Sequence, residues 1–87
     1  MKHASEETLT GLTSLLTRIR SFDGLVEKSP GVFYRRSKAF LHFHEDPEGL
    51  FVDVRFRDGE PFTRLPVTTS RQQSTLVAGI RRALSDQ

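Results

Sequence analysis

Apolar and polar residues alternate along the middle of the chain, between Lys38 and Arg57. In residues 50–57 every second side chain is apolar, which is the pattern of a β-strand buried on one face. Residues 39–44 show the same alternation, and the Asp-Pro-Glu-Gly segment at 46–49 between the two runs is typical of a turn. This stretch therefore predicts a β-hairpin with a four-residue loop.

The loop length sets the register of this hairpin. With four residues looped out, Phe43 lies opposite Val52 on one face, and His42 lies opposite Asp53 on the other. A three-residue loop would place Phe43 opposite Asp53 and mix apolar with charged residues on both faces. We therefore expect one face of the hairpin to belong to the core and the other to carry histidine and charged side chains.

A short strand is predicted before the hairpin, over residues 32–36. A two-residue turn at 37–38 would return the chain into the hairpin and place Phe33 opposite His42 on the polar face. Residues 21–31, which end in Ser-Pro-Gly, are expected to form a connector without a strand of their own.

A second hairpin is predicted at the Asp-Gly pair of residues 58–59, because this dipeptide strongly favours a tight turn between strands. The strand that follows contains two prolines, which cannot donate to a β-ladder, so we expect it at the edge of the sheet. Its register places Arg64 opposite Asp53 and Phe62 opposite Arg55.

Helical periodicity is present at both ends of the chain. Apolar residues at spacings of three and four run through residues 5–22, with Ser5 as the N-cap. A second apolar stripe occupies residues 70–84, where Ser70 and Gln73 fit a capping box. The predicted order is α-β-β-β-β-α, a two-layer α+β sandwich in which a four-stranded antiparallel meander carries both helices on one face.

Length and composition limit the possible functions. The chain has 87 residues, no cysteine and a net charge of +2. We expect one α+β domain over residues 1–87, with 1–4 and 85–87 frayed, and no disulfide or thiolate site. No apolar run could span a membrane, and MKHASEETL lacks the apolar core of a signal peptide, so a cytoplasmic location is expected.

The sheet face without helices is the predicted binding surface. Its phenylalanine, arginine and histidine content exceeds what a solvated face needs, and a contiguous apolar patch usually has a function. The surface comprises Phe33, Arg35, Phe40, His42, His44, Phe51, Asp53, Arg55, Phe62 and Arg64.

Three interpretations of this surface do not involve a metal. A homodimer would cover the phenylalanines, and self-association is the function that we expect first. Single-stranded nucleic acid could stack on the phenylalanines and pair its phosphates with Arg35, Arg55 and Arg64. Alternatively, the face has no ligand, and Asp53 simply pairs with Arg64 and His42.

A metal-dependent enzyme is the last alternative. His42 and His44 point to the same side of a strand, about 7 Å apart, and Asp53 lies opposite His42. Two histidines and a carboxylate can hold iron or zinc, although Arg64 competes for Asp53. The sequence has no nucleophile elbow or glycine-rich phosphate loop, and a flat sheet excludes little water. We therefore assign no catalytic residue and no cofactor, and an enzyme is disfavoured.

The segment GVFYRRSKAFLHFHEDPEGLFVDVRF resembles the MmcQ/YjbR group of small bacterial proteins, in which a basic turn precedes Lys-Ala-Phe. This resemblance implies a CyaY-like fold and an association with DNA binding, although Ser37 stands where that turn has glycine. The segment also resembles a luciferase-domain family of unknown function, whose His-x-His strand His42 and His44 would match. Neither family supplies active-site residues that can be transferred to this chain.

Overall fold

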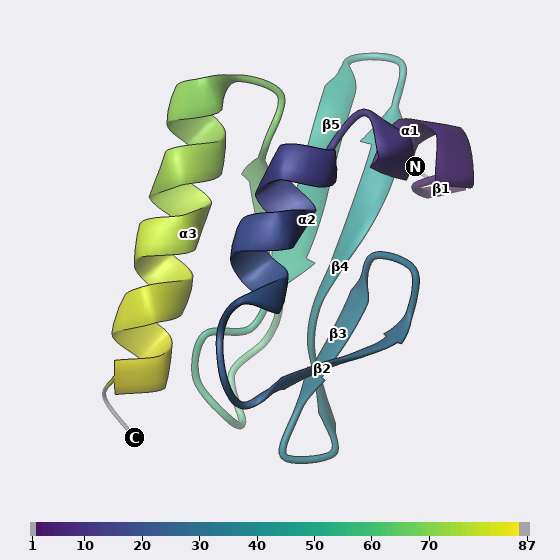
Figure 1. The fold of residues 1–87 in the computed structure, drawn as a ribbon. Helices are drawn as coiled ribbons and strands as arrows, with labels where there is room; N and C mark the ends of the chain where they lie inside the picture. The colour runs from purple at the N-terminus through teal and green to yellow at the C-terminus, as the bar shows by residue number, and fades with distance from the viewer. Residues whose placement is uncertain (1, 86–87) are drawn as a thin grey trace.

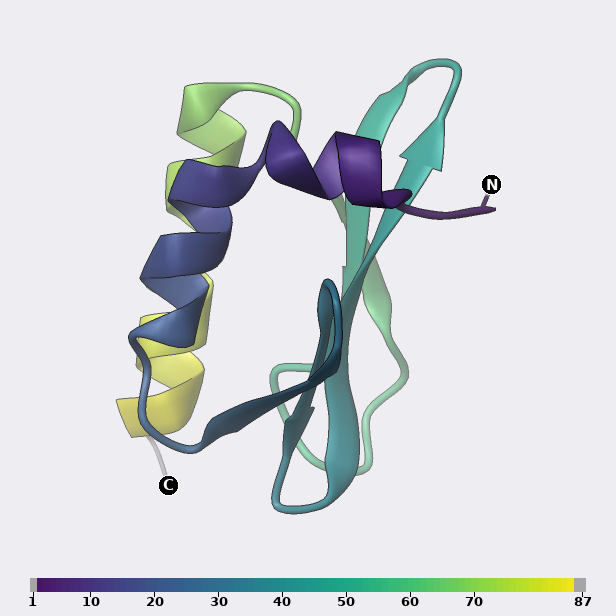
Figure 2. The same ribbon diagram turned by 45° about the vertical axis from the view of Figure 1, so that its right-hand side comes forward.

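The structure, a computed structural model, describes residues 2–85, and the helices form a layer on one face of an antiparallel sheet (Figures 1 and 2). The α+β class is therefore confirmed, whereas the predicted count of four strands is wrong, because the described residues form six. The helices are α1 (Glu6–Thr10), α2 (Thr13–Arg20) and α3 (Ser70–Ser85). The strands are β1 (Lys2–His3), β2 (Leu25–Ser29), β3 (Val32–Arg35), β4 (Lys38–Asp46), β5 (Gly49–Val54) and β6 (Thr63–Pro66).

The strands lie in the order β2-β3-β4-β5-β6, and β1 pairs with β4 beyond the end of β3. The central hairpin has the predicted register, with Phe43 opposite Val52 and His42 opposite Asp53. Arg64 lies opposite Asp53 in β6, also as predicted. Both predicted registers are therefore confirmed. Their physical reason is that a one-residue slip would move the apolar residues of β4 and β5 to the wrong face.

The register between β3 and β4 differs from the prediction. The turn consists of residues 36–37 rather than 37–38, and Phe40 is an extra residue in β4 that forms a β-bulge. The bulge places Phe33 opposite Leu41, on the face covered by the helices. Phe33 and Phe40 are 1% and 3% exposed, and the guanidinium of Arg35 reaches Ala83 of α3. These three residues therefore do not belong to the open face, and that part of the predicted surface is wrong.

The first predicted helix is divided into α1 and α2 at Gly11 and Leu12. Ser5 caps α1 as predicted, because its side-chain oxygen accepts the backbone N–H of Thr8. The Leu12 N–H bonds to the carbonyl of Leu9 three residues earlier, which closes α1 with a tight turn at the weakly helix-forming Gly11. Leu9 and Leu12 are both buried beneath this break.

Two strands lie where none was predicted. β2 occupies part of the expected connector, and β1 occupies residues expected to fray. β1 is held to β4 by the pairs Lys2–Glu45 and His3–His44 and by a hydrogen bond from the Ala4 N–H to the Phe43 carbonyl. Of the other end expected to fray, Ser85 is the last residue of α3, and residues 86–87 lie outside the described part.

The last helix begins with a capping box one residue earlier than predicted. Thr69 accepts the backbone N–H of Gln72, and the Gln72 side chain accepts the N–H of Thr69 in return. Further along α3, Gly79 packs against the ring of Phe56, so the helix lies close to the sheet. No helix within residues 2–85 is long and apolar enough to cross a bilayer.

Candidate metal centre

The open face of the sheet carries two rows of side chains that follow from the observed pairing. One row runs across β3, β4, β5 and β6, and Val32 takes the place predicted for Phe33. The members of this row are Val32, His42, Asp53 and Arg64. The second row begins on β1 and consists of His3, His44, Phe51 and Pro66.

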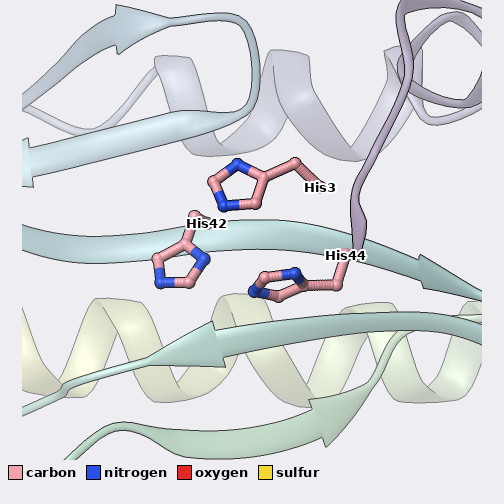
Figure 3. A group of neighbouring side chains, drawn as sticks. All are labelled: His3, His42 and His44. Atoms are coloured by element: carbon pink, nitrogen blue, oxygen red, sulfur yellow. The ribbon is translucent and has the colours of Figure 1, made fainter. Parts of the chain in front are cut away.

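All three histidines of the chain meet on this face (Figure 3). His42 and His44 are two residues apart on β4, so both imidazoles project from the same side of the sheet. His3 is brought to them because β1 pairs it with His44. The potential ligand nitrogens all lie within 4.8 Å of one another, and the His42 and His44 ring centroids are 4.6 Å apart.

Several nitrogens of this histidine cluster are buried without a hydrogen-bond partner. Among the described residues, nothing donates to or accepts from Nδ1 of His42 or either ring nitrogen of His44. His44 is only 8% exposed. Because a buried polar atom without a partner is destabilising, the arrangement is one that a bound cation would complete.

Asp53, which completed the metal site considered as an alternative from the sequence, is held by Arg64. Nε and Nη2 of Arg64 each donate to one carboxylate oxygen at 2.8 Å, and these hydrogen bonds are the main cause that lowers the Asp53 pKa. Nε2 of His44 lies 3.1 Å from the same carboxylate, outside the direction of a hydrogen bond. We therefore place Asp53 beside the histidine cluster, where its negative charge favours a cation.

The surroundings of His42 favour its neutral form. Burial is the main cause that lowers the pKa of His42, and the neighbouring His44 lowers it further. A neutral imidazole keeps a nitrogen lone pair available to a metal. Three imidazoles suit borderline divalent ions such as Zn²⁺, Cu²⁺, Ni²⁺ or Co²⁺, and three protein ligands leave one coordination position open.

The remaining predicted surface residues surround the cluster. Phe62 is 38% exposed and lies with its ring 5.3 Å from that of His42. The guanidinium of Arg55 lies 4.6 Å from the centroid of the Phe62 ring. Phe51 is half-buried in the second row. The open face thus carries fewer exposed aromatic rings than the prediction assumed, since Phe33 and Phe40 lie in the core.

Sequence reasoning missed His3 because no local pattern marks it. It precedes the first helix cap in a segment without alternation, and its partners lie about forty residues away in β4. The histidine count was the available signal. The chain has three histidines, and His3 is the one that does not lie on β4.

Comparison of this chain with protein-family models, with curated proteins and with solved structures finds no match. The resemblances to the MmcQ/YjbR group and to the luciferase-domain family therefore stay predictions.

Proposed function

We propose that this protein binds a divalent transition-metal ion, with Zn²⁺ as the reference ion, through His3, His42 and His44. The observation that carries the proposal is the convergence of the three imidazoles within 4.8 Å, together with buried ring nitrogens that have no partner among residues 2–85. Binding leaves the fourth position of the ion to water or to an external ligand. No step of catalysis is assigned to it.

The geometry needs only a small adjustment to close around an ion. A tetrahedral Zn²⁺ with Zn–N bonds of about 2.0–2.1 Å holds its nitrogens about 3.4 Å apart. His3 lies exposed on a two-residue strand, so its ring can rotate toward the two histidines on β4. Asp53, held by Arg64, contributes negative charge close to the ion.

Calorimetric titration of untagged, metal-free protein with Zn²⁺ tests the proposal. We expect one ion per chain, and the loss of any one histidine should weaken binding roughly tenfold or more, because even residues behind a ligand have effects of that size. His3→Ala is the most informative variant, since His3 is exposed and lies outside the core.

Lys2→Ala is the matched control, because Lys2 is the other residue of β1 and offers no ligand at the site. It should bind Zn²⁺ as the wild type does. Equal affinities of the wild type and His3→Ala would contradict a three-histidine site.

Self-association and nucleic-acid binding through the open face stay untested predictions, as does a cytoplasmic location. The argument for a homodimer is weaker than the sequence suggested, because Phe33 and Phe40 are buried in the core. The large apolar side chains that remain exposed among the described residues are Val26 and Phe62. A metal site needs neither a partner chain nor an apolar patch.

A further inference from the structure

A second polar site lies away from the histidines, at the end of the sandwich where the β3–β4 turn and residues 55–58 approach the last turn of α3 (Figure 1). A pocket of about 140 Å³ opens there. Parts of Phe40 and Phe56 form its apolar wall. Four cationic side chains line the rest of the pocket, and they are Arg35, Arg36, Lys38 and Arg55.

The positive charges of Arg35 and Arg55 in this basic pocket are only partly compensated. Arg55 donates to the backbone carbonyl of Ala39 at 2.8 Å, and Arg35 lies 3.5 Å from the carbonyl of Ala83. A carbonyl satisfies one N–H but leaves the guanidinium charge in place, and each guanidinium has five N–H donors. Among the described residues that line the pocket, Asp58 is the single carboxylate.

That carboxylate forms an exposed ion pair with Lys38, at 2.9 Å. Such a pair contributes little to stability, so an anion can replace Asp58 as the partner of Lys38 at small cost. Burial lowers the pKa of Arg35, and the charge of the neighbouring Arg36 lowers it further. An anionic ligand would relieve this repulsion.

Two residues of the turn at the rim of the pocket have a disfavoured backbone conformation. Arg36 and Ser37 have φ values of 53° and 68°, in the left-handed region where glycine, asparagine and aspartate are preferred. Residues held in disfavoured backbone conformations often mark functional sites. Here the conformation keeps an arginine on the rim of the basic pocket.

The geometry points to a phosphate-binding site in this pocket, for the phosphate monoester group of a small ligand or of a nucleic-acid end. Guanidinium groups match phosphate oxygens in geometry and charge, and the apolar wall can contact the group that carries the phosphate. The pocket holds the phosphate and the atoms next to it, so the remainder of the ligand extends into solvent. The site is independent of the proposed metal centre, because no histidine lines it.

Titration of metal-free protein with phenyl phosphate, followed by amide NMR shifts, tests this site. We expect saturable shifts at residues 35–40 and 55–58, with benzoate binding more weakly than phenyl phosphate. Arg35→Gln and Arg55→Gln should each weaken binding about tenfold, because charge-assisted hydrogen bonds to phosphate are lost. Arg71→Gln is the matched control, since Arg71 lies exposed in the first turn of α3, at the other end of that helix.

Arg36→Gly separates binding from folding. Glycine accepts the left-handed backbone, so this variant should fold while binding phenyl phosphate more weakly. Unchanged affinity in Arg35→Gln, Arg36→Gly and Arg55→Gln would overturn the site. So would the absence of saturable shifts with wild-type protein.

A short oligonucleotide with and without a 5′-phosphate distinguishes the two carriers of the phosphate group, a small ligand and a nucleic-acid end. Preference for the phosphorylated strand would support the site and identify its ligand as a nucleic-acid end. Binding of phenyl phosphate with no binding of either strand would support a free metabolite. Equal binding of both strands, without binding of phenyl phosphate, would overturn the proposal in favour of general contact with the nucleic-acid backbone.

Discussion

His44 is the most enclosed polar side chain of the open face, and its surroundings explain why the histidine cluster forms. His44 pairs with His3 of β1 on one side and with Phe51 of β5 on the other, so water has little access to it. The carboxylate of Asp53 lies beside the imidazole of His44 and accepts two hydrogen bonds from Arg64. The imidazole is thus enclosed by its neighbours, while both of its ring nitrogens lack a hydrogen-bond partner among the described residues.

A second carboxylate, Glu27, has a structural role on the helix face. It accepts two hydrogen bonds from Arg20, at 2.6 Å and 2.9 Å, and a third from the Gly31 N–H at 3.0 Å. These contacts join α2 to β2 and to the turn before β3. The hydrogen bonds from Arg20 are the main cause that lowers the Glu27 pKa.

We predict that Glu27→Gln destabilises the protein by about 0.5–1 kcal/mol at pH 7, since the ion pair is partly exposed. Because the pKa of Glu27 is lower in the folded chain, its contribution is complete above the unfolded value of about 4.3. The contribution is lost as the pH falls through the folded pKa. Urea unfolding at several pH values should show the difference between wild type and variant disappear under acid conditions. A difference that persists there would contradict this assignment.

At the scale of elements, the β3–β4 hairpin decides the composition of both faces of the sheet. The tight turn and the bulge at Phe40 together give β3 a different register against β4 from the one that simple alternation predicts. The open face loses the rings of Phe33 and Phe40 to the core and gains Val32 beside His42. The same turn places the cations of the basic pocket.

The second residue of that turn gives a test of its geometry. Ser37→Gly should raise the free energy of unfolding by about 1 kcal/mol, because glycine has no Cβ to clash in the left-handed conformation. Ser74→Gly in the exposed middle of α3 is the control, and it should lower stability by a few tenths of a kcal/mol. Thermal unfolding measures both effects. A destabilised Ser37→Gly variant would contradict the left-handed turn.

At the scale of the whole molecule, one sheet connects two different polar sites. The histidine cluster depends on β1, which ties the N-terminal segment to the middle of the sheet. The basic pocket depends on the opposite end of the sandwich, where the sheet approaches the last turn of α3. The helix layer leaves the face with the histidines uncovered (Figure 2).

If the metal centre binds as proposed, Zn²⁺ stabilises the whole fold. A free concentration 100 times the Kd adds about 2.7 kcal/mol, which corresponds to a rise in Tm of roughly 10–20 °C for a domain of this size. His3→Ala should lose most of this rise, and Mg²⁺, which prefers oxygen ligands, should cause none. A scanning-calorimetry experiment with equal shifts for both ions would indicate an unspecific ionic effect.

Local patterns determined much of this protein from the sequence alone. Strict alternation in two adjacent runs admits one register with a pure apolar face, so the pairing of His42, Asp53 and Arg64 across three strands was predicted correctly. The apolar stripes at helical spacing predicted the last helix and the position of the first two. These features depend on residues that are near one another in the sequence.

Tertiary structure decided what local patterns do not encode. The bulge at Phe40 arises where burying an additional ring in the core outweighs regular pairing, and the strand β1 exists because β4 offers it free backbone groups beyond β3. His3 joins His42 and His44 through that long-range pairing. The sequence by itself therefore determined the face that carries His42, Asp53 and Arg64, and the long-range contacts decided which other side chains meet there.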